Sequence, residues 1–534
     1  MKHRRLATVG TAATIAALLL GGCGSSSERD GDGAAASTSI LDVSSTASIT
    51  TWDPVKSFST EVFYLANVYE PLLWANPPGA AERFRPGLAT SWTRSDDAKT
   101  WTFTLRDGVR FHDGTPLTPA AVKQSILAAK ERGGAAFLWS ALDRITTPDA
   151  RTVVFHMSTP TEVDVAASSM YGAWIVAPAA LAAAARDEQH FERTPDADAG
   201  TGPYEVADYT PGKQVVLKAS PGYWDRDGGG HFRTVNVQIT KDAVAEQQMV
   251  EGGQVDVAMT VPLENVEQFE RDDRFQVKTC ESSLTYLGFF NTTRKPLDDP
   301  KVRRALSLAL PYQEIIDVGA EGYGIPAHGP VPAGVFPFDE AVPQSEQDLA
   351  EARRLLAEAG HPGGGFSLRL TYAAENDQQK KFAPLIKDAL AKLGVNVTIT
   401  GKLFNQQWEE AKGDPGEAQD MFLLLYWPTA SDAGADNLMT LFRSSEEPFF
   451  NLSYWRSAQY DRLVDEAVAV TATDRDKAQA LYTRAMRLLV DEAPGAYFYD
   501  VRRPVVMAKA LSGWECNPNY SFNVFFHRLG VAGA

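Results

Sequence analysis

The chain of 534 residues contains little cysteine, little histidine and a deficit of positive charge. Its 51 lysines and arginines are outnumbered by 68 acidic residues, which gives a formal net charge of −17. Nucleic-acid binding requires a basic stripe, so this composition argues against that function. The eight histidines and three cysteines are scattered rather than grouped at ligand spacing, so we expect neither a resident metal ion nor another cofactor.

Sequence patterns of catalysis are missing as well. We find no nucleophile elbow, no zinc-binding His-Glu-x-x-His pattern and no phosphate-binding Walker loop. Gly212-Lys213 is followed by Gln214 instead of Ser or Thr, and it lacks the upstream glycine of such a loop. Paired acids such as Asp96-Asp97 sit in turn-like contexts, which favours a role in turns over acid–base chemistry. We therefore predict that the chain is not an enzyme.

Long hydrophobic runs are confined to the amino terminus. Residues 1–22 join a positive stretch to an apolar run at 7–20, which is too short to cross a bilayer comfortably and predicts a signal peptide. The run ends in Leu20-Gly21-Gly22-Cys23, which resembles the bacterial lipobox. That resemblance implies a lipid on Cys23 and an anchor on the extracytoplasmic face of the cell membrane, whereas the alternative is a signal peptide that merely contains a cysteine. Residues 23–39 are rich in Gly and Ser and predict a flexible tether.

The two cysteines beyond this segment, Cys280 and Cys516, form an even pair in a chain that we expect to be exported. Such a pair indicates one disulfide bond. Two buried free thiols are the alternative. A bridge would close a very long loop and would stabilise the fold by roughly 5 kcal/mol at most in the chain-entropy account.

Length and pattern together predict several lobes of mixed α/β structure. A single hydrophobic core stops growing near roughly 250–300 residues, so we expect two or three lobes. Periodicity predicts strands at 40–51, 215–218, 235–239, 367–372 and 395–400, and helices at 61–73, 347–360, 382–393 and, as a pair, 461–490.

The most informative stretch lies in the first quarter of the chain. Side chains from Trp101 to Arg106 alternate between apolar and polar, which is the pattern of a half-buried strand. Asp107-Gly108 supplies a two-residue turn, and Val109 and Phe111 resume the apolar face, so we expect a hairpin. Thr118-Pro119 can then start a helix, with the threonine as its cap and the proline in its first position.

This stretch resembles the signature of the peptide/nickel class, family 5, of bacterial extracellular solute-binding proteins, which serve ATP-driven importers. A second resemblance covers residues 286–317, where the family enters its last lobe. The matching positions are Leu88-Ala89, Ser91-Trp92, Asp96-Asp97, Phe103, Leu105-Arg106, Gly108-Val109, Phe111-His112-Asp113-Gly114 and Val122 in the first stretch, and Asn291, Pro296, Asp299, Val302-Arg303, Ala305-Leu306, Ala309 and Ile315 in the second.

The resemblance implies an α/β periplasmic-binding-protein fold of type II with three lobes. Lobe I would combine residues 40–75, 200–285 and 505–534, lobe II would be 76–199, and lobe III would be 286–504. Lobes I and III would close on a solute about a hinge made where the chain crosses between them. The monomer would then dock on an ABC permease that is driven by an ATPase subunit.

The commonest role of the family implies a dipeptide or an oligopeptide as the solute. Within the same class of protein, the alternatives are a glycan, an opine or a metal chelate. From a different class, the alternatives are a non-transport interaction protein of the cell envelope and an enzyme that uses the same fold.

Candidate contacts to the solute follow from the resemblance. Trp427 comes after a hydrophobic strand, at a place where peptide-binding members carry a Trp followed three residues later by an Asp that pairs with the α-ammonium group of the peptide. Here that position is Ala430, and Asp432 and Asp436 are the nearest carboxylates. The alternative roles are core packing for the aromatic candidates and a loop cap for Asp432. Weaker candidates are Tyr69, Glu70, Trp139, Tyr497 and Tyr499.

Overall fold

The structure is a computed structural model that describes residues 40–193, 199–225, 232–430, 434–448 and 450–531. The described residues belong to one compact unit. The predicted signal peptide, Cys23, the tether and Asp432 lie outside the described residues. The boundaries of three lobes within the unit stay a prediction.

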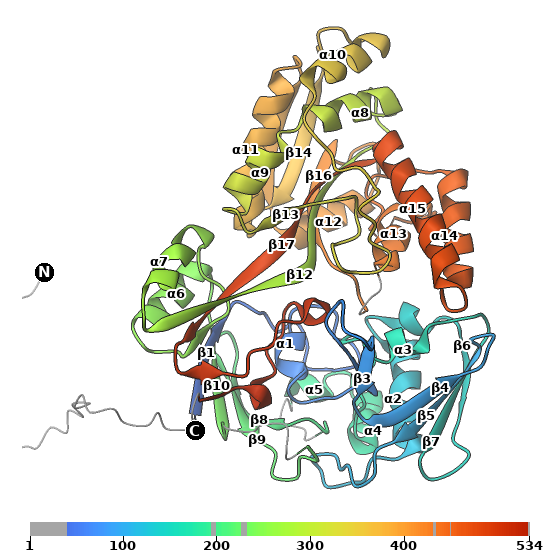
Figure 1. Cartoon of the computed structure of the whole chain (residues 1–534), viewed down its shortest axis with the longest axis vertical. Helices are drawn as coiled ribbons and strands as arrows, with labels where there is room; N and C mark the ends of the chain where they lie inside the picture. The colour runs from blue at the N-terminus through green and yellow to red at the C-terminus, as the bar shows by residue number, and fades with distance from the viewer. Residues whose placement is uncertain (1–39, 194–198, 226–231, 431–433, 449, 532–534) are drawn as a thin grey trace, which may run out of the picture. The chain divides into compact units, whose positions relative to one another are not determined.

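In the described part of the chain, the main sheet contains eleven strands. Two long antiparallel strands cross its centre, β12 (Phe275–Phe290) and β17 (Gly495–Ala508), drawn in green and red in Figure 1. On one side of this pair follow β11 (Val257–Ala258), β1 (Ile40–Ser45), β10 (Thr234–Ile239), β9 (Gln214–Ala219) and β8 (Tyr204–Thr210). On the other side follow β16 (Met421–Tyr426), β14 (Ser367–Ala373) and β15 (Asn396–Lys402), while β13 (Gly324–Pro326) pairs with β17.

The pairing of β12 with β17 is interrupted near its middle. It is regular from Phe275 to Glu281 and resumes at Thr285, so the residues between them lie out of register. Beside this interruption, Cys280 forms a disulfide bond with Cys516, with a Cα–Cα distance of 5.4 Å. The structure therefore contains the bridge that the even pair indicated, and not two free thiols.

Helices cover both faces of the sheet beyond β12. The side chains of Met421 and Leu423 on β16 belong to a core that is packed by helices on one face, and those of Phe422 and Leu424 belong to a core on the other face. A strand that is buried on both faces reads as a continuous hydrophobic run, which the sequence MFLLLY of β16 shows. The first face carries α8 (Pro300–Ala309), α9 (Tyr312–Gly319), α10 (Leu349–Glu358) and α11 (Asp377–Ala391); the second carries α12 (Phe404–Lys412), α13 (Ala435–Phe442), α14 (Ala458–Thr471) and α15 (Arg475–Glu492).

A smaller sheet of four strands lies early in the chain, in the order β4 (Ala89–Arg94), β5 (Thr100–Leu105), β7 (Thr152–Met157) and β6 (Leu142–Thr146). The alternation predicted for β5 is confirmed, since Trp101, Phe103 and Leu105 are buried. The predicted hairpin is wrong. β4 and β7 occupy both edges of β5, and the segment after it folds on itself, with Phe111 N donating to Thr115 O at 2.8 Å.

Helix α2 (Pro119–Arg132) begins as predicted, because Thr118 Oγ1 accepts a hydrogen bond from Ala121 N at 3.2 Å. The predicted helix at 61–73 is much shorter, α1 (Val62–Leu65). Pro71 lacks a backbone N–H and disfavours helix before it, and the chain turns into β2 (Leu73–Ala75), which pairs with β3 (Phe84–Pro86).

The remaining elements are short. No helix in the described ranges has both the length and the apolar character needed to cross a bilayer. The short elements are α3 (Val163–Ala166), α4 (Pro178–Arg186), α5 (His190–Arg193), α6 (Ala243–Glu251) and α7 (Val266–Arg271), the pair β18 (Leu511–Ser512) and β19 (Gly530–Val531), and the 3-10 turns η1 (Ala136–Trp139), η2 (Leu263–Asn265), η3 (Pro518–Tyr520) and η4 (Phe526–Arg528).

Candidate functional site

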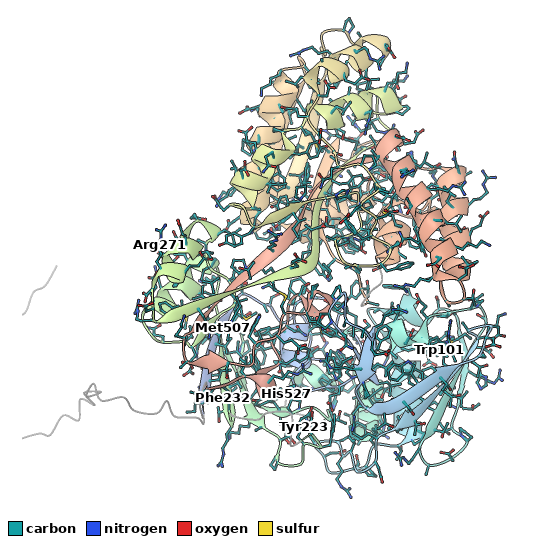
Figure 2. All side chains as sticks on the ribbon, in the orientation of Figure 1. Trp101, Tyr223, Phe232, Arg271, Met507 and His527 are labelled. Carbon is teal, nitrogen blue, oxygen red and sulfur yellow. A yellow bond between two sulfur atoms is a disulfide. The ribbon has the colours of Figure 1, made fainter. Side chains whose placement is uncertain are left out.

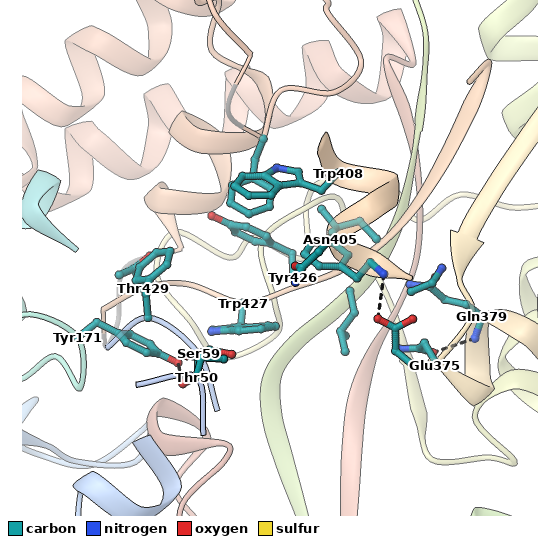
Figure 3. A pocket seen from close by; sticks show the side chains of 17 residues that line it. Thr50, Ser59, Tyr171, Glu375, Gln379, Asn405, Trp408, Tyr426, Trp427 and Thr429 are labelled. Atoms are coloured by element: carbon teal, nitrogen blue, oxygen red, sulfur yellow. Dashed lines mark hydrogen bonds between the residues drawn. The ribbon is translucent and has the colours of Figure 1, made fainter. Parts of the chain in front are cut away.

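A cavity of about 440 Å³, the main cavity below, lies against the end of β16 and the loop that follows it (Figure 3). Its volume falls in the range of pockets that bind small molecules. Its aromatic lining residues are Phe58, Tyr171, Phe404, Trp408, Tyr426, Trp427 and Phe450, and its polar ones are Thr50, Ser59, Glu375, Asn376, Gln379, Asn405 and Thr429.

Stacked rings form one wall of the main cavity. Phe404 and Trp408 are one helical turn apart on α12, and their ring centroids lie 6.5 Å apart with nearly parallel planes. Trp408 also stacks on Phe450, with ring centroids 5.4 Å apart. Lys412 Nζ lies 3.6 Å from the centre of the Trp408 ring. Such rigid, amphipathic faces suit a site that holds apolar parts of a solute.

Trp427 is half-buried and lies on a loop whose backbone is fixed by hydrogen bonds. Asp436, at the start of α13, accepts hydrogen bonds from Thr429 N at 2.8 Å and from Thr440 Oγ1 at 2.7 Å. Ser169 Oγ donates to Thr429 O at 2.9 Å. Partial burial raises the pKa of Asp436, against the effect of these hydrogen bonds. The carboxylate therefore positions the loop of Trp427 and does not line the main cavity, contrary to the predicted solute contact.

The charged groups of the site lie in two adjoining cavities. Glu375 is the carboxylate that lines the main cavity, and it accepts a hydrogen bond from Phe404 N at 2.9 Å. A second cavity of about 230 Å³, the arginine cavity below, is lined by Arg502 and Arg503. Asn376 and Leu425 line both cavities. The pair of cavities thus offers negative charge in one part and positive charge in the other.

Arg503 contacts the last segment of the chain at the arginine cavity. Its guanidinium group donates to Ser521 O and lies 5.7 Å from the centre of the Phe522 ring. Burial lowers the pKa of Arg503, although the nearby charge of Glu246 opposes this effect. A group that loses water in this way gains most from an anionic partner.

Several predicted contacts lie elsewhere in the fold. Trp139 is fully buried, stacks on Phe155 and donates from Nε1 to Gly172 O at 2.7 Å, so it packs the core behind the four-stranded sheet. Tyr497 and Tyr499 point into the cores on the two faces of β17, where their rings meet Phe442 and Tyr286. None of these three side chains lines a described cavity. Their burial corrects the predicted roles to core packing.

Tyr69 and Glu70 are also misplaced by the prediction. Tyr69 is buried in the core that contains β1 and α2. Glu70 lines a cavity of its own, which shares no residue with the main cavity. The prediction that Asp432 binds the ammonium group stays a prediction, since Asp432 lies outside the described residues.

Sequence reasoning missed Tyr171, Glu375, Trp408 and Phe450. Only the pair Phe404 and Trp408 carried a signal, because two aromatic residues four positions apart in a polar stretch predict one face of a helix. Tyr171 and Phe450 stand in irregular segments, where no periodicity shows which way a side chain points. Among the described residues, no group of three or more His, Cys, Asp or Glu side chains could hold a metal ion.

Comparisons with known proteins agree with this architecture. Residues 83–449 match the family described as bacterial extracellular solute-binding proteins, family 5. The chain is 29% identical over 442 residues to the glutathione-binding protein GsiB of Pectobacterium atrosepticum, covering 82% of this chain and 84% of GsiB. It is 27% identical over 443 residues to the probable D,D-dipeptide-binding periplasmic protein DdpA of Escherichia coli K12, covering 81% and 82%. The structure of AgaA from A. tumefaciens R10 with agropinic acid superimposes with a TM-score of 0.77 at 25% identity, covering 93% of this chain and 99% of AgaA.

Proposed function

We propose that this chain, which belongs to family 5 of the bacterial extracellular solute-binding proteins, captures a short peptide in the main cavity and delivers it to an ABC permease. The observation that carries the proposal is the distribution of charge, with Glu375 at the main cavity and Arg502 and Arg503 at the arginine cavity. A peptide has an ammonium group at one end and a carboxylate at the other. It would lie with its amino end toward Glu375 and its carboxyl end toward the two arginines.

The kinds of solute named for similar proteins support a peptide. GsiB is described as binding glutathione and DdpA as binding a D,D-dipeptide. AgaA was solved with agropinic acid, which makes an opine the second candidate. The carboxylates of an opine would also reach Arg502 and Arg503. The contact of an ammonium group with Glu375 is therefore what distinguishes a peptide from an opine.

We further propose that β12 and β17 bend where their pairing is interrupted, so that the parts of the chain on either side close on the solute. The predicted lobes, 40–75 with 200–285 and 505–534, 76–199, and 286–504, would be the moving units. A lipid on Cys23 would hold the monomer at the membrane, and the solute would leave chemically unchanged.

Thermal unfolding in the presence of dipeptides and tripeptides tests the proposal, because a ligand that binds only the folded state raises the melting temperature. Free peptides should raise it. We expect acetylation of the amino end, or amidation of the carboxyl end, to weaken the affinity roughly tenfold or more, since each removes a charge-assisted contact. The proposal fails if no peptide changes the melting temperature, or if free and blocked peptides bind equally well.

A pair of variants locates the amino end. Glu375→Gln should remove the preference for a free over an acetylated peptide, because the amide carries no charge. Glu466→Gln, at an exposed position of α14, is the matched control and should keep the preference. An unchanged preference in Glu375→Gln would remove Glu375 from the proposed contact.

A further inference from the structure

A third cavity, of about 330 Å³, lies where the end of the chain meets the loops before β2 and after β9, and we call it the Glu70 cavity. Figure 2 labels two of its lining residues, Tyr223 and His527, whose ring centroids are 5.9 Å apart. Its volume is at the lower end of the range for ligand pockets. It shares no lining residue with the main cavity or the arginine cavity. A ligand of the Glu70 cavity would therefore bind in addition to the proposed peptide.

Glu70 supports one wall of this cavity. Its carboxylate accepts hydrogen bonds from Thr201 Oγ1 at 2.9 Å, Tyr223 OH at 3.1 Å and Trp224 Nε1 at 2.9 Å. Burial raises the pKa of Glu70 to about 7, while the three hydrogen bonds and the charge of Arg106 act in the opposite direction. The side chain is occupied by these donors, and its role is to fix two aromatic rings in place.

Two arginines at the cavity form no ion pair at contact distance with any described residue, although Arg106 lies near the Glu70 carboxylate and Arg85 near that of Glu515. Arg106 places its guanidinium carbon 4.0 Å from the centre of the Trp224 ring, and its Nε donates to Gly87 O at 3.2 Å. Arg85 donates from Nη1 to Asn76 Oδ1 at 3.2 Å. Within the ranges that the structure describes, no carboxylate forms an ion pair with either group. A third arginine, Arg528, is paired with Glu515.

The environment of Arg85 disfavours the positive charge of its guanidinium group. Burial lowers its pKa, and the charge of Arg528 lowers it further. His527 adds a neutral polar group, because burial and then the charges of Arg528 and Arg85 lower its pKa to about 3. Its Nδ1 atom is buried and has no hydrogen-bond partner among the described residues. In the described chain, the wall thus holds two guanidinium groups that have hydrogen-bond acceptors but no ion pair, while Asp225 is a further carboxylate that lines the cavity without pairing with either of them.

We propose that the Glu70 cavity binds a small organic anion with a planar or apolar body, whose carboxylate or phosphate group meets Arg85 and Arg106. A guanidinium group presents parallel N–H donors that match either anionic group. Trp74, Tyr223 and Phe525 would pack against the body of the ligand. The proposal is independent of the peptide site, since it uses none of the same residues.

Calorimetric titration of the full chain with benzoate and with phenyl phosphate tests this proposal, with benzyl alcohol as the neutral control. At least one anion should bind and the alcohol should not, and an excess of a bound dipeptide should not displace the anion. Affinity should fall with added salt, because partly exposed charges are screened. The stronger of the two anions identifies the headgroup.

Variants assign the binding to these residues. Arg85→Gln and Arg106→Gln should each weaken anion binding roughly tenfold or more, through loss of one charge-assisted contact. Arg144→Gln, at an exposed position of β6, is the control and should bind as the native chain does. If Arg106→Gln does not fold, Arg85→Gln alone decides. The proposal is overturned if neither anion binds, or if the bound anion is unaffected by Arg85→Gln.

Discussion

The indole ring of Trp427 meets the ring of Phe522 edge to face, with ring centroids 5.0 Å apart and an angle of 71° between their planes. Trp427 follows β16, whereas Phe522 belongs to the last segment of the chain, which the bridge from Cys516 to Cys280 fixes to β12. Phe522 also lines the arginine cavity. The contact therefore places Trp427 at the border of the two cavities that we propose for the peptide.

Trp427→Ala should weaken peptide binding at least roughly tenfold, because it removes a large aromatic surface from the main cavity. Calorimetric titration with a bound dipeptide measures the change. Trp92→Ala is the control, since Trp92 is a half-buried residue of β4 that lines none of the described cavities, and its affinity should be unchanged. Equal affinity of native and Trp427→Ala chains would assign Trp427 to packing alone.

Cys280→Ser should lower the free energy of unfolding, by roughly 5 kcal/mol at most, because the bridge closes a loop between positions 236 residues apart. Denaturant unfolding under non-reducing conditions measures this loss. The double variant with Cys516→Ser should be about as stable as either single variant, since one bond is lost in each case. Losses that add in the double variant would show that the thiols act independently.

The buried carboxyl group of Glu246 on α6 should make stability depend on pH. It accepts hydrogen bonds from Ser44 Oγ at 3.2 Å and Thr260 N at 3.1 Å, but burial outweighs these contacts and raises its pKa from 4.5 to about 7. The folded-state pKa is above the unfolded one, so the folded state binds this proton more tightly. The contribution of Glu246 to the free energy of unfolding is complete below about pH 4.5 and is lost as the pH rises through about 7.

Glu246→Gln removes this titration. Between about pH 4.5 and pH 7.5 the free energy of unfolding of the variant should improve relative to the native chain, by up to about 3 kcal/mol. Urea unfolding at several pH values measures the difference. Glu251→Gln, at an exposed position of the same helix, should follow the native profile. Parallel profiles for Glu246→Gln and the native chain would contradict the assignment.

Cys23→Ser should release the protein from the membrane fraction, because the predicted lipid is attached through the Cys23 sulfur. Fractionation of cells followed by immunoblotting measures the distribution. The Cys280→Ser variant is a control for the loss of a cysteine as such and should stay with the membranes. Retention of the Cys23→Ser variant would rule out acylation as the anchor.

Local sequence patterns predicted those elements whose conformation depends on interactions between neighbouring residues. The alternation from Trp101 to Leu105 and the cap at Thr118 depend on neighbouring residues only, and both are confirmed. The hairpin after β5 failed because its partner strands come from residues 89–94 and 152–157, which no local pattern reveals. Strand pairing over such distances is decided by the whole fold.

The site was predicted only in part for the same reason. Trp427 could be placed because a hydrophobic strand leads directly to it. The resemblance implies a solute contact for Glu70, but its hydrogen bonds to Thr201, Tyr223 and Trp224 come from more than 130 positions away, and they place it at a different cavity. Trp408 and Glu375 line the same cavity as Trp427 through the tertiary arrangement around β16, which no local pattern reveals.

The bridge between Cys280 and Cys516 has a consequence for a chain that is exposed to proteases. A cut at an exposed loop such as residues 413–417 leaves two fragments that remain joined through sulfur. Nicked molecules would migrate at full size on a gel without reductant and would separate into two bands after treatment with dithiothreitol. A single backbone break in this region would therefore not shed either fragment.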